Sequence, residues 1–339
     1  MSKRIKIIAG SLAVAALCAA ALLWHDATTS PFRIDDDAFI HILPNADTDD
    51  VEQQLRSEAR ADNLRLWHLL TTLTHYTPRS GRYVVRPADT MLDVFRRLRS
   101  GAQEPVRLVV PSTRGLHRMA GAIARHTMLD SALVAAAFAD TTFIASTGYT
   151  PETFPALFIP DTYEVYWDTP LDALIERLQR ENDAFWQQQG RTAAADSLGL
   201  TREEVYTLAS IVDEETAATA EKPDVAGLYL NRLRMGMPLQ ADPTVKYAVG
   251  DETLRRIRGN HLAIESAYNT YQHAGLPPGP IRIASKAGID AVLHPTSHTY
   301  IYMCAREDFS GRHNFATTYA QHQQNARRYQ RALNARGIR

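Results

Sequence analysis

The sequence is poor in cysteine and carries almost no net charge. Its 339 residues include two cysteines, Cys18 and Cys304, so one disulfide at most can form and packing must hold the fold together. With 45% hydrophobic residues, a chain of this length can bury the cores of roughly two or three domains. Lys and Arg number 37 against 38 Asp and Glu. This balance lacks the basic field of a nucleic-acid-binding protein, which argues against DNA and RNA as partners.

Several well-known catalytic motifs are also missing. The sequence has no His-Glu-x-x-His pair, no Gly-x-Ser-x-Gly turn and no glycine loop of the kind that binds phosphate. His294 and His298 flank Pro295, which argues against one helical face presenting both rings to a metal. We therefore expect no metal and no cofactor. Serine hydrolysis and nucleotide chemistry are disfavoured.

The N-terminus combines a basic start with a long apolar run. Three basic side chains within residues 1–6 precede residues 7–24, an uncharged stretch of about the length that spans a bilayer. This order predicts a cytoplasmic segment at 1–6, a transmembrane anchor at 7–24 and the rest of the chain across the membrane. A cleaved signal peptide, cut near residues 19–21, is the alternative, but the run exceeds a usual signal core. An exported part with Cys304 as its one cysteine fits a bacterial periplasmic enzyme.

Short strands and helices alternate after the anchor, which predicts an α+β fold. Residues 35–110 are expected to form a small α+β subdomain, with strands at 38–43, 82–86 and 105–111 and helices at 48–60, 62–76 and 87–101. Residues 111–339 are expected to form a larger mixed domain. It is predicted to be mainly helical over 115–196, with a loop at 154–163, helices from 202, over 223–235 and over 317–336, and a strand at 299–305.

The helix from residue 202 has a well-marked start. Thr201 is predicted to be its N-cap, with Glu204 three residues later completing a capping box. Leu200 and Val205 are spaced as a hydrophobic staple across the same boundary. The register of the residues that follow is therefore fixed from the N-terminal end.

This helix ends in three consecutive acids, of which one faces its apolar side. At about 100° per residue, Glu215 falls between Ile211 and Val212, whereas Asp213 and Glu214 fall roughly 160° and 100° away from it. We therefore predict that Asp213 and Glu214 are solvated and that Glu215 points inward. Apolar surroundings raise the pKa of a carboxyl, as a general acid near neutral pH requires. The alternative is a structural Glu215 that bends to solvent or pairs with an arginine.

Other polar side chains are candidates to reach an inward acid and bind substrate. They are Asn231, Arg232, Gln240, Asp242, Tyr268 and Asn269. The last two begin the loop 268–281, whose paired prolines between glycines fix its backbone, as in many binding loops. Cleavage of a glycosidic bond normally uses two carboxylates, and Asp242 is the obvious second one. If Asp242 is not placed opposite Glu215, the substrate must supply its own nucleophile.

Several motifs, in one order, give the sequence a family resemblance. They are Leu-Ala-Ser-Ile-Val-Asp-Glu-Glu-Thr at 208–216, the run 225–245, Ala-Tyr-Asn-Thr-Tyr at 267–271, Gly-Leu-Pro-Pro-Gly-Pro-Ile at 275–281, His-Pro at 294–295 and Phe-Ile-Pro-Asp-Thr-Tyr at 158–163. With the anchor they cover nearly the whole chain, and they resemble the endolytic murein transglycosylases of the YceG-like family. In that family the catalytic glutamate precedes the threonine of Ile-Val-x-x-Glu-Thr, which corresponds to Glu215.

The resemblance implies a single-pass enzyme of the bacterial inner membrane, with a LysM-like subdomain and a periplasmic catalytic domain. Its expected partners are peptidoglycan glycan strands and proteins of cell-wall synthesis. It implies a carbon–oxygen lyase that cleaves the bond between N-acetylmuramic acid and N-acetylglucosamine inside glycan strands and so terminates or trims nascent strands. The muramoyl C6 hydroxyl is then the nucleophile, the product ends in 1,6-anhydromuramic acid, and Glu215 alone acts as acid and base.

The sequence departs from the family pattern near its C-terminus. A family Gly-Gly-His motif stands here as Gly-Arg-His at 311–313, and Glu-His-Asn stands as Gln-His-Gln at 321–323. His313 and Asn314 are therefore expected to support substrate binding rather than to be essential. An older family label, aminodeoxychorismate lyase, is rejected because no lysine marks a cofactor site. Two rival functions stay open: a tethered glycan-binding scaffold that cuts nothing, and a hydrolytic muramidase that uses Asp242 and water.

Overall fold

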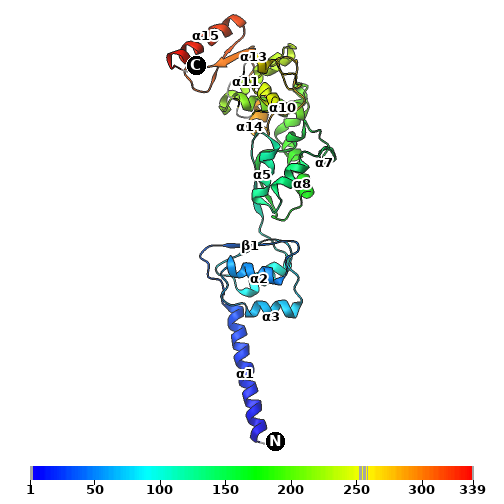
Figure 1. Cartoon of the computed structure of the whole chain (residues 1–339), viewed down its shortest axis with the longest axis vertical. Coiled ribbons are helices and arrows are strands. Elements are labelled where there is room, and N and C mark those ends of the chain that lie inside the picture. The colour runs from blue at the N-terminus through cyan, green and yellow to red at the C-terminus, as the bar shows by residue number, and fades with distance from the viewer. Residues whose placement is uncertain (1–2, 252–253, 255–256, 258, 338–339) are drawn as a thin grey trace. The chain divides into compact units, whose positions relative to one another are not determined.

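The chain folds into two compact units, each with its own hydrophobic core. The computed structural model describes residues 3–251, 254, 257 and 259–337, and Figure 1 labels several of its elements. Unit 1 comprises residues 1–107, 126–128 and 164–169, and unit 2 comprises the remainder from 108 to 339. The described strands form three two-stranded sheets, β1–β2, β3–β4 and β5–β6. The mixed α+β class expected from the sequence is confirmed.

The chain begins with a long apolar helix, α1 (Lys3–Thr28). Within it, Gly10–Thr28 is long and apolar enough to cross a membrane by length and composition, a property that signal sequences share. Near the end of the helix the buried carboxylate of Asp26 accepts hydrogen bonds from Asn63 Nδ2 (2.7 Å) and Arg65 Nη2 (3.0 Å). These bonds attach the C-terminal end of α1 to the rest of unit 1.

Unit 1 follows the predicted order of strands and helices. Its elements after α1 are β1 (Ala38–Ile42), α2 (Thr48–Ser57), α3 (Arg65–Thr74), β2 (Gly81–Val85) and α4 (Met91–Ser100), with β3 (Val106–Val110) next in the chain. Strands β1 and β2 are antiparallel, with Ala38 opposite Val85. Helix α4 ends as predicted at Gly101, whose φ of 74° is the left-handed conformation that glycine adopts without strain.

Unit 2 is mainly helical and holds the longer part of the chain. Its elements are α5 (Leu116–His126), α6 (Ser131–Ala137), α7 (Thr141–Ser146), η1 (Phe154–Leu157), β4 (Asp161–Val165), α8 (Leu171–Gln187), η2 (Gln188–Gly190), α9 (Arg191–Leu198), α10 (Arg202–Glu215), η3 (Thr219–Glu221), α11 (Lys222–Arg234), α12 (Asp242–Val249), α13 (Gly259–Leu262), α14 (Lys286–Leu293), β5 (Tyr302–Ala305), β6 (His313–Ala316) and α15 (Tyr319–Ala335). The predicted helices from 202, over 223–235 and over 317–336 correspond to α10, α11 and α15.

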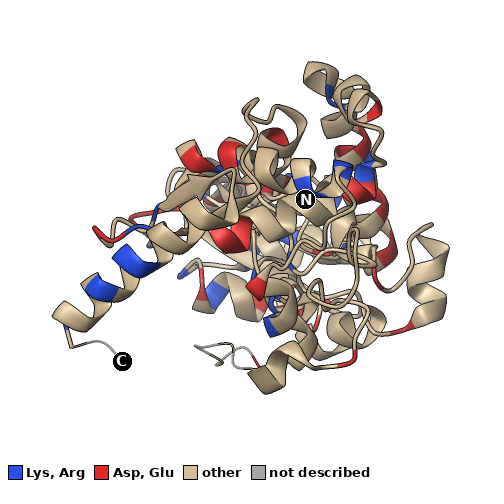
Figure 2. Ribbon diagram, turned by 90° about the horizontal axis from the view of Figure 1, so that it is seen from above, with Lys and Arg blue, Asp and Glu red and all other residues tan. Residues whose placement is uncertain are grey.

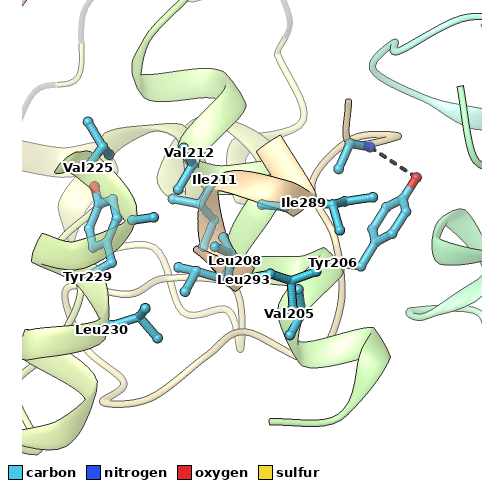
Figure 3. Close-up of a cluster of buried hydrophobic side chains, with 14 of the residues drawn as sticks. Val205, Tyr206, Leu208, Ile211, Val212, Val225, Tyr229, Leu230, Ile289 and Leu293 are labelled. Atoms are coloured by element: carbon cyan, nitrogen blue, oxygen red, sulfur yellow. Dashed lines mark hydrogen bonds between the residues drawn. The ribbon is translucent and has the colours of Figure 1, made fainter. Parts of the chain in front are cut away.

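Helix α10 is the centre of unit 2. Its predicted capping box is confirmed, because Thr201 Oγ1 accepts from Glu204 N and Glu204 Oε2 accepts from Thr201 N. All eight residues from Val205 to Val212 are buried, and α10 packs against both α11 and α14. Figure 3 shows the aliphatic side chains of these helices between two tyrosines, Tyr206 on one side and Tyr229 on the other. A helix buried on every side fixes the position of its last turn.

Several elements of unit 2 were missing from the sequence prediction. The expected loop at 154–163 contains the short helix η1 and the start of strand β4, and helices α12 and α14 and strand β6 were not predicted. Helix α14 and strand β6 are only eight and four residues long, which is too short for a periodic pattern to identify them. Two of the missed elements, α12 and β6, contribute side chains to the cavity described below.

Charged residues of both signs are interspersed along the chain, as Figure 2 shows. The C-terminal helix α15 departs from this pattern, because it carries arginines at 327, 328 and 331 and no acidic residue. The even distribution agrees with the formal net charge of −1.

We expect the close packing of α14 on α10 to make Gly288 intolerant of a side chain. A Cβ at this position would lie 2.5 Å from Asp213 Oδ1, and Asp213 is held in place by buried partners. Gly288→Ala should therefore lower the free energy of unfolding by about 1–3 kcal/mol despite the better helix propensity of alanine. The measurement is chemical unfolding of unit 2 followed by circular dichroism.

The matched control is Gly121→Ala in helix α5. A Cβ there would meet no atom closer than 3.8 Å, and that atom is the mobile end of Arg125. This variant should gain about 0.5–1 kcal/mol. Equal effects of the two substitutions would contradict the packing argument.

Candidate active site

The last turn of helix α10 places three consecutive carboxylates, Asp213, Glu214 and Glu215, in a buried region. The side chain of Asp213 is 2% exposed and that of Glu214 is 4% exposed. Removing a carboxylate from water costs several kcal/mol unless a cation or hydrogen-bond donors replace the water. The partners of each acid therefore decide what that acid can do.

Asp213 and Glu214 are neutralised by cations. Lys222 forms an ion pair with Asp213, and Ser285 donates to the same carboxylate from its hydroxyl at 2.8 Å. Glu214 receives two guanidinium groups, with Arg114 Nε at 2.7 Å and Arg282 Nη1 at 2.9 Å from Oε1. Both acids thereby join α10 to neighbouring segments as structural groups.

The predicted solvation of Asp213 and Glu214 is wrong. The prediction assumed that α10 has one apolar face and one face in water, whereas the helix is enclosed on all sides. Its last turn meets Lys222 at the start of α11 and two arginines, Arg114 and Arg282, from segments distant in the sequence. The helical register therefore predicts the direction in which each of the three acids points, but it does not predict which of them is exposed to solvent.

Glu215 differs from its neighbours because it makes no ion pair with any described residue. Its partner is a neutral hydroxyl, since Tyr229 Oη donates to Glu215 Oε1 at 2.6 Å. Burial raises the pKa of Glu215 to about 7, and this effect outweighs the Tyr229 hydrogen bond and the nearby His313, which lower the pKa. Asp242 raises the pKa slightly further and Arg232 lowers it. The predicted inward orientation and raised pKa agree with this environment.

Glu215 opens into a cavity of about 260 Å³. Helix α11 contributes Tyr229 and Arg232 to its wall, and β5 and β6 close the cavity with Cys304 and His313. The remaining lining residues come from α11, from the loop before α12, from the start of α12, from the loop after α13 and from β5: Leu228, Leu239, Gln240, Asp242, Tyr271, Met303 and Ala305. The acid thus lies on a solvent-connected space between the helical core and the β5–β6 hairpin.

Four of the predicted substrate-binding residues line this cavity with Glu215. They are Arg232, Gln240, Asp242 and His313. Gln240 is exposed and has a φ of 52°, a strained left-handed conformation that is often found at functional sites. Asp242 accepts from the hydroxyl of Tyr271 at 2.7 Å. The Arg232 guanidinium donates most of its hydrogen bonds to backbone carbonyls, including those of Ile301 (2.7 Å) and Leu239 (2.9 Å).

The other three predicted residues lie outside the cavity wall. Asn231 Nδ2 donates to the carbonyls of His298 (2.8 Å) and Tyr300 (3.1 Å), so it holds the segment before β5. Asn269 is fully buried and binds backbone groups of its own loop. Tyr268 packs on Tyr247, with ring centroids 4.7 Å apart. The observed contacts of Asn231 and Asn269 are with the backbone and belong to the scaffold.

Three residues that shape the site were not among the predicted site residues. Tyr229 is the direct partner of Glu215, and Tyr271 is the partner of Asp242. Glu221 accepts hydrogen bonds from the backbone N (2.7 Å) and the ring Nδ1 (3.0 Å) of His313. Tyr229 and Tyr271 lie inside motifs that the sequence analysis identified. Glu221 lies between two such motifs, and no local pattern distinguishes it.

The fold and the site can now be compared with known proteins. The profile of the YceG-like family matches residues 40–328. The chain belongs to the YceG-like family. The resemblance seen in the sequence is thereby confirmed, and Glu215, Tyr229 and His313 all lie within the matched region.

Curated relatives of this YceG-like protein carry one name. A protein of Bacillus subtilis (strain 168), named endolytic murein transglycosylase, is 28% identical over 269 residues, which cover 74% of this chain and 72% of that protein. A protein of the same name from Streptococcus pneumoniae serotype 2 is 30% identical over 170 residues, which cover 49% of this chain and 30% of that protein. The chain thus spans less than a third of the streptococcal relative.

A solved structure shows the same fold. The 2.6 Å crystal structure of a yceG-like protein from Listeria monocytogenes superposes with a TM-score of 0.57. The match covers 86% of this chain and 99% of that one at 24% sequence identity.

We expect Tyr229→Phe to raise the pKa of Glu215 above its value of about 7. The phenol donates to Glu215 and favours its ionised form, so removal of the hydroxyl leaves burial unopposed by this bond. Titration of the ¹³C-labelled glutamate carboxyls by NMR, with the Glu215 signal assigned by its absence in Glu215→Gln, measures the change.

Tyr206→Phe is the matched control for the loss of a buried hydroxyl. Tyr206 lies on α10 itself, donates to the carbonyl of Phe158 at 2.6 Å and accepts from Ala284 N. It makes no contact with Glu215, so the titration of Glu215 should stay as in the wild type. A shift of Glu215 in this control, or none in Tyr229→Phe, would contradict the assignment.

Proposed function

We propose that this protein is an endolytic lytic transglycosylase that cleaves peptidoglycan strands between N-acetylmuramic acid and N-acetylglucosamine. The observation that carries the proposal is the buried carboxyl of Glu215, which has no ion-pair partner among the described residues and lies on a cavity wall with a pKa of about 7. Such a group can donate and accept a proton near neutral pH. The names of the curated relatives support the same reaction class, a carbon–oxygen lyase acting on polysaccharide.

In the proposed reaction Glu215 acts twice. Protonated Glu215 gives its proton to the glycosidic oxygen as the bond between this oxygen and muramoyl C1 breaks. The muramoyl C6 hydroxyl oxygen then bonds to C1, and its proton returns to Glu215, which leaves a 1,6-anhydromuramoyl end and a free hydroxyl on the leaving sugar. No water is consumed. Because the cycle starts from the protonated acid, activity should fall as pH rises through the pKa of Glu215.

The names of the curated relatives favour this route over hydrolysis. Hydrolytic glycosidases use a second carboxylate as base or nucleophile. Asp242 lines the cavity as an exposed carboxylate, and its Oδ1 accepts a hydrogen bond from Tyr271 at 2.7 Å. We assign Asp242, with Arg232, Gln240 and His313, to orienting the sugar and its lactyl-peptide groups.

We further propose how the whole chain is placed at the cell wall. Helix α1 would act as an uncleaved single-pass anchor in the inner membrane, with residues 1–6 in the cytoplasm and the catalytic domain, residues 111–339, in the periplasm. Residues 35–110 would be the LysM-like subdomain and bind glycan, which their separate small α+β core supports. In this position the enzyme would cut nascent strands beside the synthesis proteins that make them.

We expect Glu215→Gln to abolish the formation of anhydro ends. Glutamine keeps the size of the side chain but carries no transferable proton, so the rate should fall about 10²- to 10⁴-fold. Full-length protein in detergent micelles is incubated with isolated glycan strands, and the products are identified by mass spectrometry. Glu203→Gln, in the first turn of the same helix and outside the cavity, serves as the control and should retain wild-type activity. Undiminished anhydro ends from Glu215→Gln would refute the assignment.

The end groups of the products separate the two rival functions. We expect Asp242→Asn to produce fewer ends, all of them anhydro, because Asp242 orients substrate and does not activate water. A muramidase would instead release reducing ends in the wild type and lose them in Asp242→Asn. A scaffold would bind glycan strands and leave their mass unchanged.

A further inference from the structure

A buried carboxylate holds the one histidine of the catalytic cavity. The Glu221 side chain is 8% exposed and that of His313 is 14% exposed. Glu221 Oε1 accepts from the backbone N of His313 at 2.7 Å, and Oε2 lies 3.0 Å from His313 Nδ1. Two contacts to one residue fix both the position of strand β6 and the plane of the imidazole ring.

The contact with Glu221 determines which ring nitrogen of His313 is available for a contact in the cavity. Nδ1 is occupied by Glu221, whereas Nε2 has no hydrogen-bond partner among the described residues. His313 lines the same cavity as Glu215, and the charge of its ring lowers the pKa of Glu215. Nε2 is therefore the ring nitrogen that remains available for a contact in the cavity.

The burial of Glu221 also bears on the charge of the His313 ring. A buried carboxylate is stable when it is paired with a cation. Within the described chain the ion pair of Glu221 is with His313 and with no Lys or Arg. The imidazolium form of His313 is the form that neutralises Glu221.

We propose that Glu221 and His313 form the charge partner of Glu215, in which Glu221 positions the imidazolium and the imidazolium stabilises the Glu215 carboxylate during the reaction. The inference rests on the proposed function of Glu215 and adds two roles to it. His313 acts on the reacting acid, and Glu221 is a positioning residue that acts through His313.

The pair acts at one stage of the proposed cycle. When Glu215 gives its proton to the glycosidic oxygen, a negative charge develops on a buried carboxyl. Tyr229 supplies one neutral donor to it, and the imidazolium supplies the compensating charge. When the C6 hydroxyl returns its proton, the carboxyl is neutral again. The protons on the ring do not change over the cycle, so the balance of the reaction is unaltered.

Removal of the ring should give a signature that mere misfolding does not. The other titratable or charged groups lining the cavity with Glu215 and His313 are Tyr229, Arg232, Asp242, Tyr271 and Cys304. All of them remain in His313→Gln, which deletes only the imidazolium. The pKa of Glu215 should then rise, because the positive charge of the ring no longer favours the carboxylate. The basic limb of the pH profile for kcat should move up by the same amount, while kcat at its optimum falls about ten-fold.

Glu221→Gln tests the positioning role. Glutamine can still accept from the backbone N of His313 but carries no charge to hold the imidazolium. The basic limb should move in the same direction as in His313→Gln by a smaller amount. The double variant should show no shift beyond that of His313→Gln alone, because Glu221 acts through the ring.

Glu307→Gln is the matched control in the same hairpin. Glu307 Oε2 accepts from Asn314 Nδ2 at 2.6 Å, so it holds the β6 residue next to His313, yet it does not line the cavity. This variant should keep both kcat and the position of the basic limb. All variants are assayed as full-length protein, with circular dichroism to verify folding and ¹³C carboxyl titration of Glu215 as a readout independent of activity.

The outcomes separate this inference from the proposed function. If wild type makes anhydro ends and Glu215→Gln does not, the function of Glu215 stands. An unchanged or lowered Glu215 pKa in folded His313→Gln would then overturn the charge-partner role alone. Retained anhydro ends in Glu215→Gln would overturn the function itself.

Discussion

The candidate active site depends on how three adjacent carboxylates are neutralised at the end of one buried helix. Buried acids must find cations or donors, and α10 brings three of them into the core in consecutive positions. Asp213 and Glu214 are paired with Lys222, Arg114 and Arg282 and so become part of the scaffold. Glu215 is left with a phenol. The unequal supply of positive charge, rather than unequal burial, separates the proposed reactive acid from the structural ones.

The same ion pairs hold the framework around the cavity. Asp213 joins the end of α10 to the starts of α11 and α14 through Lys222 and Ser285. The β5–β6 hairpin, which forms the opposite wall, is attached to α11 by side chains that lie on or beside that helix: Asn231, Arg232 and Glu221. Asn231 and Arg232 were expected to contact substrate. The observed bonds of both residues fix the wall that substrate would meet, and Arg232 also lines the cavity itself.

Local signals in the sequence predicted the parts of the fold that local physics determines. The Thr201 and Glu204 capping box and the stop at Gly101 are formed as expected, because each depends on residues within one turn. The solvation of Asp213 and Glu214 was predicted wrongly because it depends on residues far along the chain. Arg114 and Arg282 lie 100 and 68 positions from Glu214, and a helical register contains no information about them.

The partner of Glu215 suits the proposed two-step chemistry better than a cation would. An arginine on this carboxyl would favour its ionised form strongly, so the group would lack the proton that the first step needs. Purely apolar surroundings would hold the proton too firmly for a carboxylate to form. The phenol of Tyr229 at 2.6 Å and the His313 ring, which is bound by Glu221, lie between these extremes. Both lower the pKa of Glu215, whereas burial raises it, and the resulting pKa is about 7. A lone acid that must both give and take a proton requires this balance.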